Sequence, residues 1–380
     1  MMNNTAITSI LPDAQRIVIK TGSALVTHEA TCQPRSEWMA SLAEDIAALK
    51  KSGKQVILVS SGAVSLGRNL LGLDTKTLLS LDEKQAAAAC GQVALMDAWR
   101  TSFAAHHLTV AQLLLTLDTS EFRRHYLNAR NTLDTLLTLG AIPIVNENDT
   151  VATAELKIGD NDRLAARVAE MASADALLIL SDIDGFYTAD PRKQTDAAYL
   201  HHVPELTSEI EAMASNSSST HGTGGMITKL QAVKIAHGAG CHTWIGAGRP
   251  LHPIKQLQSQ GGGTWFTATA TPKSARKRWI SGTVKPTGSI IIDTGAQRAL
   301  TQGNSLLAAG ICGIDGQFDR GETVYIRTAD GTAIGKGLIA YNSHETRLIM
   351  GKKSDVFESL LGYKGKNTLI HRDDMVLDHN

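Results

Sequence analysis

The sequence predicts a three-layer α/β sandwich with a mostly parallel central sheet, followed by a small β-rich domain. Three observations carry this prediction. Short apolar segments alternate with longer segments of helical periodicity through the first two-thirds of the chain, which is the pattern of strand–helix–strand units. Beyond residue 261, short strand-like segments separated by turns replace this alternation. The length of 380 residues favours two domains, because single cores seldom exceed roughly 250–300 residues.

The strands of the large domain are expected where Val, Ile and Leu form short continuous runs. Such runs fit the strands of a parallel sheet, because helices cover both of its faces and leave no polar face. The expected strands lie at residues 16–20, 55–60, 108–116, 141–149, 176–182 and 242–248.

Helices are expected between these strands. In the first, Met39, Leu42 and Ile46 recur at helical spacing. Ser36 can cap the start of this helix and Gly53 can end it. Further helices are expected at residues 83–105, 122–139, 160–173 and 226–239.

The last part of the chain has a different character. The segment that starts at residue 261 is glycine-rich, then polar and basic, which is typical of a linker. Beyond it, Asp330-Gly331 separates two strand-like segments and favours a tight hairpin. We therefore expect a large domain at residues 1–270, a linker at 271–283 and a β-rich domain at 284–380.

Composition narrows the class of protein. Lys and Arg together number 37, as do Asp and Glu, so the net charge indicates no polyanionic partner. The four cysteines are widely spaced, which predicts free thiols rather than a disulfide framework or a metal site. The first residues lack the basic and apolar regions of a signal peptide, and no apolar run reaches the ~20 residues of a membrane span. We expect a cytoplasmic protein that has no membrane segment.

The glycine-rich segment "HGTGGMITK" at residues 221–229 predicts an anion-binding loop. Glycines let backbone N–H groups approach a phosphate closely, and Lys229 adds a positive charge. The segment is not a P-loop, because no glycine directly precedes the lysine. A scaffold other than that of the P-loop enzymes is therefore required.

Polar residues also follow four of the expected strands. Ligands of open α/β sheets bind beyond the carboxyl ends of the strands, so the loops that follow them open on one edge. A "GDND" segment at residues 159–162 precedes an expected helix and joins this set. The strand-end residues are Lys20, Gly22 and Ser23; Ser60, Ser61 and Gly62; Asn146, Glu147, Asn148 and Asp149; and Ser181, Asp182 and Asp184.

Each segment has an ordinary structural explanation when taken alone. Glycine after a strand commonly forms a turn, and the acidic residues of "GDND" suit a helix N-cap. Lys20 alone could equally be a surface charge. The "DIDG" segment at residues 182–185 lacks the later ligands of a calcium loop. A functional site is favoured because all these loops are expected at one edge of one sheet.

The set fits phosphoryl transfer, which requires positioning and charge neutralisation more than a covalent group from the protein. Lys20 and Lys229 could flank the transferred group, backbone amides could bind its oxygens, and carboxylates could hold a substrate ammonium or orient the lysines. The sequence does not decide whether Asp160 or Asp162 orients the lysines. The amides are those of Gly22, Gly62, Gly224 and Gly225, and the carboxylates are those of Asp149, Asp160 and Asp162.

The ordered motifs resemble those of the glutamate 5-kinases, a branch of the amino acid kinase family. The tail, with "ATPKSARKRWISG" and "YNSHETRLI", resembles a PUA domain. The resemblance covers about residues 16–375 and implies the amino acid kinase fold followed by a PUA-like barrel. The motifs are "VIKTGSALVT", "LVSSGAVSLG", "YLNARNTL", "PIVNENDTVAT", "KIGDNDRLAA", "LILSDIDGFYTADPR" and "GTGGMITKLQA".

This resemblance implies ATP-dependent phosphorylation of the γ-carboxylate of L-glutamate, the first step of proline biosynthesis. ATP is then the co-substrate, and Mg²⁺ is bound through the nucleotide phosphates. The resemblance also implies a homo-oligomer that proline inhibits by feedback.

The roles of residues follow from the resemblance by position. Lys20 and Lys229 would act on the transferred group together with Asp160 and Asp162. Ser61, Asp149 and Asn161 would bind glutamate. Asp149 would pair with the ammonium group of glutamate, and Asn161 would bind the α-carboxylate of glutamate. Two departures are Ala24, where a second hydroxyl residue is common, and Ser181 in place of a threonine. The implied ATP-binding residues are Lys20, Ser181, Asp182, Thr223, Gly224, Gly225, Met226, Ile227, Thr228 and Lys229.

Two alternatives remain open at this point. Related kinases act on aspartate, acetylglutamate, carbamate or nucleotides and share the lysines and the glycine-rich loop. The "NENDxVAT" and "GDND" motifs and the PUA-like tail favour glutamate. An RNA-binding role is the other alternative, but residues 276–380 hold 14 Lys and Arg against 11 Asp and Glu, a difference of +3. Binding to a phosphate backbone normally needs a denser basic face, so we do not expect a nucleic-acid partner.

Overall fold

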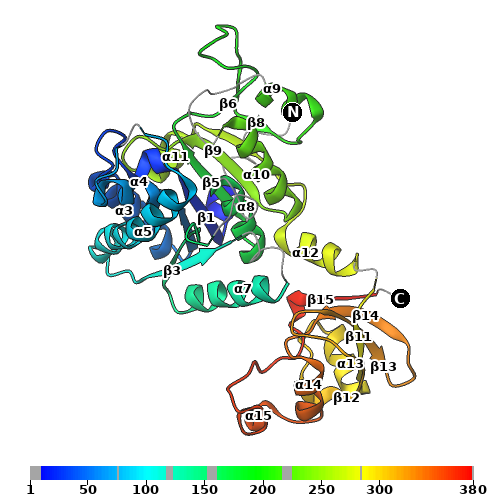
Figure 1. The fold of residues 1–380 in the computed structure, drawn as a ribbon. Coiled ribbons are helices and arrows are strands. Elements are labelled where there is room, and N and C mark those ends of the chain that lie inside the picture. The colour runs from blue at the N-terminus through cyan, green and yellow to red at the C-terminus, as the bar shows by residue number, and fades with distance from the viewer. Residues whose placement is uncertain are drawn as a thin grey trace. The chain divides into compact units, whose positions relative to one another are not determined.

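The computed structural model describes residues 10–74, 77–116, 123–151, 161–215, 225–282 and 285–378. The chain divides into two compact units, Met1–Pro272 and Lys273–Asn380. Figure 1 shows the helices and strands of each unit.

The first unit is built on an eight-stranded sheet, ordered β3-β4-β2-β1-β5-β9-β10-β8. Every neighbouring pair from β3 to β9 is parallel, whereas β10 runs antiparallel to β9. The mostly parallel sheet predicted from the sequence is confirmed. The strands are β1 (Arg16–Thr21), β2 (Gln55–Ser60), β3 (Val110–Leu115), β4 (Ile142–Glu147), β5 (Ala176–Ser181), β8 (His202–Val203), β9 (His242–Ala247) and β10 (Thr264–Phe266).

Helices cover both faces of this sheet (Figure 1). Alternate residues of a strand point to opposite faces, so Ile17 and Ile19 of β1 pack into one apolar cluster and Val18 packs into another. This arrangement confirms the three-layer sandwich. The first cluster includes residues of α3 (Ser36–Lys51), α4 (Ala63–Leu70), α5 (Leu81–Ala104) and α11 (Pro253–Gln260), and the second those of α7 (Arg123–Thr138), α8 (Asn161–Ala172), α9 (Ser208–Ser215) and α10 (Met226–Gly238).

Helices α4 and α5 pack backbone against backbone. A Cβ atom on Gly67 would lie 1.7 Å from the carbonyl oxygen of Ala87, and one on Gly91 would lie 1.8 Å from that of Ala63. Only glycine fits at either position. This close approach holds the middle of α5 against the start of α4, which directly follows the loop at the end of β2.

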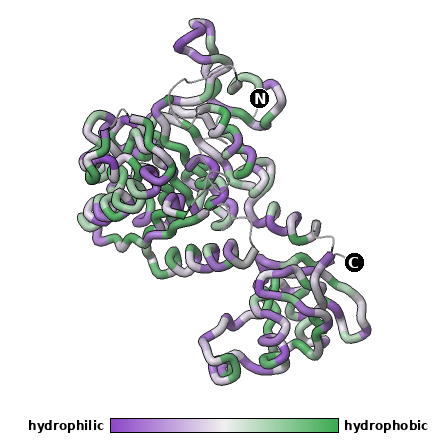
Figure 2. The backbone as a smooth tube through the Cα atoms, viewed as in Figure 1, coloured by the Kyte–Doolittle hydropathy of each residue, from purple (hydrophilic) through white to green (hydrophobic). Residues whose placement is uncertain are grey.

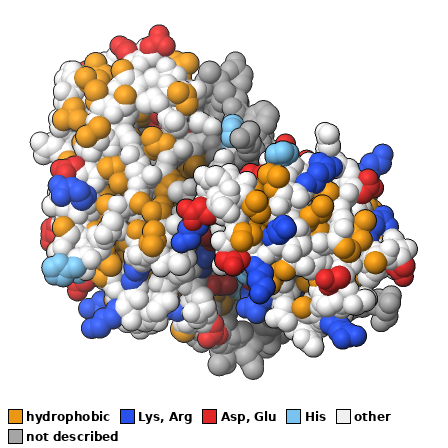
Figure 3. All heavy atoms as spheres, turned by 90° about the horizontal axis from the view of Figure 1, so that it is seen from below, with side chains coloured by type: hydrophobic (Ala, Val, Ile, Leu, Met, Phe, Trp, Pro, Cys, Tyr) orange, Lys and Arg blue, Asp and Glu red, His pale blue; other side chains and the backbone are white. Residues whose placement is uncertain are grey.

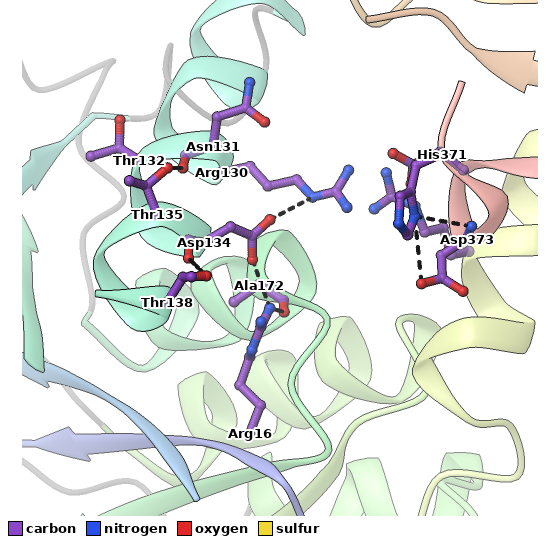
Figure 4. Close-up of polar contacts among 12 residues, drawn as sticks. Arg16, Arg130, Asn131, Thr132, Asp134, Thr135, Thr138, Ala172, His371 and Asp373 are labelled. Carbon is purple, nitrogen blue, oxygen red and sulfur yellow. Dashed lines mark hydrogen bonds and ion pairs between the residues drawn. The ribbon is translucent and has the colours of Figure 1, made fainter. Parts of the chain in front are cut away.

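The amino-terminal edge of the sheet is closed by a cluster of charges (Figure 4). Asp134 of α7 pairs with Arg16 at the start of β1 at 2.9 Å, and with Arg130 at 3.7 Å. Arg16 also donates to the carbonyl oxygen of Ala172, the last residue of α8. The carboxylate of Asp175 accepts the backbone N–H of Arg16 at 2.8 Å. These contacts join α7, α8 and β1 at this edge.

The second unit contains a five-stranded sheet, ordered β12-β11-β13-β14-β15, with an apolar core of its own. The predicted hairpin is present, because β13 and β14 pair antiparallel on either side of Asp330-Gly331. Gly331 has a φ of +88°, a conformation that favours glycine. The predicted β-rich domain is confirmed. Its elements are β11 (Gly288–Ile292), β12 (Ile311–Gly316), β13 (Thr323–Thr328), β14 (Ala333–Leu338), β15 (Met375–Leu377), α13 (Thr294–Thr301), α14 (Ser343–Ile349) and α15 (Phe357–Leu361).

The segment at residues 271–283, which the sequence suggested as a linker, carries helix α12 (Pro272–Ser281). Proline at the first helical position suits a helix start, since its missing N–H is not needed there. Arg276 pairs with Asp374 at 2.7 Å, which ties α12 to the end of the second unit. The division of the chain falls between Pro272 and Lys273, at the start of this helix.

Many apolar residues of the chain lie in three buried clusters. Figure 2 shows hydrophobic stretches concentrated among the strands of the first unit. Within the described ranges, we find no helix with both the length and the apolar character needed to cross a membrane.

Candidate active site

The loops predicted to carry the chemistry lie at the carboxyl edge of the sheet. Strand β1 has β2 on one side and β5 on the other, so the chain reverses its winding at β1. Thr21 pairs in register with Ser60 of β2 and Leu180 of β5, so these three strands end at the same level. Lys20 therefore lies where ligands bind in sheets of this type.

The centre of the site is a buried cluster of two lysines and one aspartate. The Nζ atom of Lys20, on β1, lies 2.6 Å from Oδ1 of Asp162. The Nζ atom of Lys229, on α10, lies 2.9 Å from Oδ2 of the same carboxylate. All three side chains are buried. Lysines from distant parts of the chain therefore meet on a single carboxylate.

The charges of this cluster favour an ionised Asp162. Burial alone would raise the pKa of its carboxyl group, but the charges and hydrogen bonds of Lys20 and Lys229 outweigh burial and lower the pKa below its ordinary value. Two neighbouring ammonium groups repel each other, and the carboxylate that both contact offsets this repulsion. Two ammonium groups held in this way suit the binding of a phosphoryl group.

A chain of hydrogen bonds joins the residues predicted to bind the substrate. The Nδ2 atom of Asn161 donates to Oγ of Ser61 at 2.5 Å and to Oδ1 of Asn146 at 3.3 Å. The Nδ2 atom of Asn146 donates to Oε1 of Gln92 at 2.8 Å. Asp149 is half-buried in the loop that follows β4, at the same edge of the sheet.

Helix α5 holds the end of β2 in place through a hydrogen bond. Its Trp99 donates from Nε1 to Oγ of Ser60 at 2.9 Å, and the Ser60 hydroxyl donates to the carbonyl oxygen of Ser61 at 3.1 Å. The next residue, Gly62, has a φ of +120°, which disfavours any residue with a side chain. The position of Ser61 is thus fixed by backbone conformation and by α5.

The predicted nucleotide-binding residues fall in two places. Ser181 ends β5 and donates from Oγ to Oδ1 of the exposed Asp182 at 3.2 Å. Gly225 is the N-cap of α10 and has no side chain to cap the helix, which leaves its first N–H groups for an anion. In the first turn, Thr228 donates from Oγ1 to the carbonyl oxygen of Gly225 at 2.7 Å, and Ile227 is exposed. Met226 begins the helix, whereas Asp160, Thr223 and Gly224 lie outside the described residues.

Sequence reasoning missed the contributions of Gln92 and Trp99. A weak signal was available, because both side chains lie on the face of α5 that Leu95 and Phe103 mark as buried. A glutamine on an apolar face is uncommon, since burying an amide costs free energy unless it is hydrogen-bonded.

Comparison with known proteins identifies the scaffold. The model of the "Amino acid kinase family" matches residues 15–247, which include the whole carboxyl edge described above. The chain belongs to the amino acid kinase family. Beyond this amino acid kinase region, the model of the "PUA domain" matches residues 288–361, within the second unit.

Curated members of the amino acid kinase family resemble the chain over nearly its whole length. The "Glutamate 5-kinase" of Paramagnetospirillum magneticum is 55% identical over 370 residues, which are 97% of this chain and 100% of that protein. The "Glutamate 5-kinase" of Rhodospirillum rubrum is 53% identical over 95% of this chain and 96% of its own length. That of Gluconobacter oxydans is 52% identical over 97% of each chain. The resemblance found in the motifs is confirmed.

Charges of both signs lie on one face of the molecule. On the face that Figure 3 shows, basic and acidic side chains are interspersed rather than gathered in one basic patch. This distribution does not favour the RNA-binding alternative.

Proposed function

We propose that the chain catalyses the ATP-dependent phosphorylation of the γ-carboxylate of L-glutamate, which yields L-glutamyl 5-phosphate and ADP in the first step of proline biosynthesis. The observation that carries this proposal is the buried cluster in which Lys20 and Lys229 share Asp162. The identity of 52–55% with proteins named "Glutamate 5-kinase" supports the choice of glutamate among the acceptors that this family uses.

The transfer itself needs no general base. An oxygen of the γ-carboxylate attacks the γ-phosphorus of ATP, and an O–P bond forms as the bond to the bridging oxygen of ADP breaks. ADP leaves with the electron pair of that bond. Because the carboxylate is already ionised at neutral pH, no proton has to be removed. The protein contributes positioning and charge stabilisation, which are the main requirements of phosphoryl transfer.

Lys20 and Lys229 stabilise the negative charge that moves from nucleotide to acceptor. Asp162 holds both ammonium groups in place before the substrates arrive, so they need not reorganise during the reaction. Of the two aspartates that the sequence left undecided, Asp162 is the one we assign to orienting the lysines. Asp160 lies outside the described residues, and its catalytic role stays a prediction.

The nucleotide is proposed to bind as its magnesium complex. Ser181, Asp182 and the start of α10, from Gly225 to Lys229, would contact it, together with Thr223 and Gly224. Among the described residues we find no group of three or more His, Cys, Asp or Glu that could hold a metal. We propose that the ion is bound through the phosphates of ATP, where it neutralises part of their charge.

Ser61, Asp149 and Asn161 are proposed to bind glutamate. Ser61 and Asn161 touch each other, and Asp149 can pair with the substrate ammonium from the loop after β4. Feedback inhibition by proline, assembly into a homo-oligomer and a cytoplasmic location stay predictions from the resemblance. Proline titration of the activity and sedimentation of the purified chain would test the first two.

The proposal is tested by ADP release from MgATP with a panel of acceptors: L-glutamate, L-aspartate, N-acetyl-L-glutamate and no acceptor. We expect release with L-glutamate alone, and trapping of the acyl phosphate by hydroxylamine as the γ-hydroxamate. The hydroxamate distinguishes carboxyl phosphorylation from simple hydrolysis of ATP. Release with another acceptor, or ADP without hydroxamate, would contradict the proposal.

A further inference from the structure

Gln92 is a buried amide among the apolar residues of α5. It is 9% exposed, and the other buried residues of α5 are Ala, Gly, Leu, Trp and Phe. An amide at such a position costs free energy unless it is hydrogen-bonded. Its Oε1 accepts from Asn146, whereas its Nε2 has no partner within the described part of the chain.

A chain of hydrogen bonds runs from Gln92 through Asn146 and Asn161 to Ser61, and one backbone group sets which partner donates in each bond. The N–H of Glu147 can only donate, and it donates to Oδ1 of Asn146 at 2.9 Å. The Nδ2 of Asn146 must therefore face Gln92, and the Oε1 of Gln92 must accept its hydrogen bond. No other orientation of these two amides pairs a donor with an acceptor.

The same constraint orients Asn161. Because Oδ1 of Asn146 is an acceptor, Asn161 faces it with Nδ2, whose second hydrogen goes to Oγ of Ser61. Both donors of Asn161 are thus used within the protein. Its Oδ1 is buried and has no partner among the residues that the structure describes. Ser61 accepts a hydrogen bond from Asn161, so its own O–H is directed elsewhere.

We propose that Gln92 is a positioning residue for the amino-acid substrate. It fixes the polarity of the site, that is, which hydrogen-bonding group of Asn161 and which of Ser61 faces the substrate. With Gln92 as acceptor, Asn161 offers a carbonyl oxygen to the substrate ammonium and Ser61 offers a hydroxyl to a substrate carboxylate. This inference rests on the proposed function. It assigns Asn161 to the ammonium, whereas the sequence had suggested the α-carboxylate.

Loss of the acceptor at position 92 should disturb the polarity. In Gln92→Met, the Nδ2 of Asn146 would be buried without a partner, a state that is costly. Rotation of the Asn146 amide would relieve this cost but would set its Nδ2 against the Glu147 N–H and the Asn161 donors. Asn161 would then turn its NH₂ group toward the substrate and repel the ammonium.

The test compares Gln92→Met with Gln92→Glu, which keeps an oxygen acceptor for Asn146. We expect Gln92→Met to raise the KM for L-glutamate about 10-fold or more, with the KM for ATP changed less than about 2-fold. Gln92→Glu should stay within about 3-fold of wild type for both substrates. Gln15→Met, at an exposed position just before β1 and so at the opposite end of the sheet, is the control and should leave both KM values unchanged.

Glutarate, which is glutamate without its amino group, distinguishes a changed orientation of the site amides from general damage to the site. Its inhibition constant against glutamate should change less than about 2-fold in Gln92→Met, because the disturbed contact is the one with the ammonium. Equal weakening of glutarate and glutamate would assign Gln92 to folding alone and overturn the inference. A melting curve checks that each variant is folded, and Gln92→Leu replaces Gln92→Met if the latter is not.

Two further results would overturn the inference. A KM for glutamate in folded Gln92→Met within 2-fold of wild type would show that the acceptor is not needed. Equal impairment of Gln92→Glu and Gln92→Met would show that the Nε2 donor matters instead. A wild-type chain that released no ADP with glutamate would instead refute the proposed function, and this inference with it, so the two failures are distinguishable.

Discussion

The two ends of the parallel sheet hold clusters with the same charges. At the carboxyl end, Lys20 and Lys229 share Asp162, and at the amino end, Arg16 and Arg130 share Asp134. The difference is burial, since the Asp162 side chain is 0% exposed and that of Asp134 is 37% exposed. Solvent screens the second cluster and reduces its contribution to stability and to the local field. Burial therefore distinguishes a cluster suited to chemistry from one that joins structural elements.

The two clusters also differ in what their cations contact. Arg16 at the amino end also bonds to the backbone, since it donates to the carbonyl oxygen of Ala172. At the carboxyl end, the ammonium groups of Lys20 and Lys229 both contact the carboxylate of Asp162. Burying charged groups is costly, and clusters of buried charges with perturbed pKa values occur preferentially at functional sites.

Removing the buried carboxylate should have the largest effect. In Asp162→Asn, two buried ammonium groups lose their shared counter-charge, so we expect a loss of about 3–5 kcal/mol in the free energy of unfolding. Turnover should fall about 10²-fold or more, because the lysines are no longer held in place. Urea denaturation and glutamate-dependent ADP release measure the two effects. Wild-type stability and turnover in this variant would show that the buried cluster is not different from the exposed one.

Removing either lysine should be the next largest effect. Lys20→Ala and Lys229→Ala are each expected to lower kcat about 10²-fold, as for other groups that stabilise charge in the transition state. The fold-decrease in kcat of the double variant should be smaller than the product of the two single fold-decreases. Both lysines act on one transferred group and share Asp162, so their effects are not independent. A turnover near that of wild type in a single variant would remove that lysine from the mechanism.

The pH dependence of stability sharpens the comparison further. The native pKa of Asp162 lies below the ordinary 3.8, so the unfolded chain takes up a proton at this group at higher pH than the native chain does. The contribution of the cluster is therefore fully present above about pH 5 and is lost as the pH falls through the lowered native pKa. We expect the stability difference between wild type and Asp162→Asn to be constant from about pH 5 to 8 and to shrink below about pH 4. A difference that shrinks between pH 6 and 8 would contradict the assignment to this carboxyl group.

The smallest effect is expected at the exposed cluster. Asp134→Asn should lower the free energy of unfolding by about 1 kcal/mol or less and leave kcat unchanged, because the carboxylate is screened by solvent. The same chemical change as in Asp162→Asn makes this variant the matched control. A loss of activity at Asp134 comparable to that at Asp162 would mean that burial does not separate the two ends.

Much of the fold could be predicted because its signals are local. Continuous apolar runs marked β1, β2, β4, β5 and β9, and helical periodicity marked α3. The start of α12 within the suggested linker was missed, because its apolar residues are few and its partner, Asp374, lies about a hundred residues further along the chain. A local pattern carries no information about such a partner.

The sequence named residues for the candidate site but not the contacts between them. The strand ends named Lys20, Ser61 and Asp149, and the glycine-rich loop named Lys229. The sequence left open whether Asp160 or Asp162 orients the lysines, and it did not indicate that Gln92 would support Asn146. These contacts depend on how helices pack over the end of the sheet.

The sequence by itself determined the two domains, the strand and helix segments and the set of polar residues at the strand ends, because apolar periodicity and turn chemistry act over a few residues. Only the tertiary structure decided which of these side chains touch, since Asp162 and Lys229 are 67 positions apart and meet through the packing of α8 and α10 at the end of β1. It also decided the direction in which each amide points, because one backbone N–H, that of Glu147, orients Asn146 and through it Gln92 and Asn161.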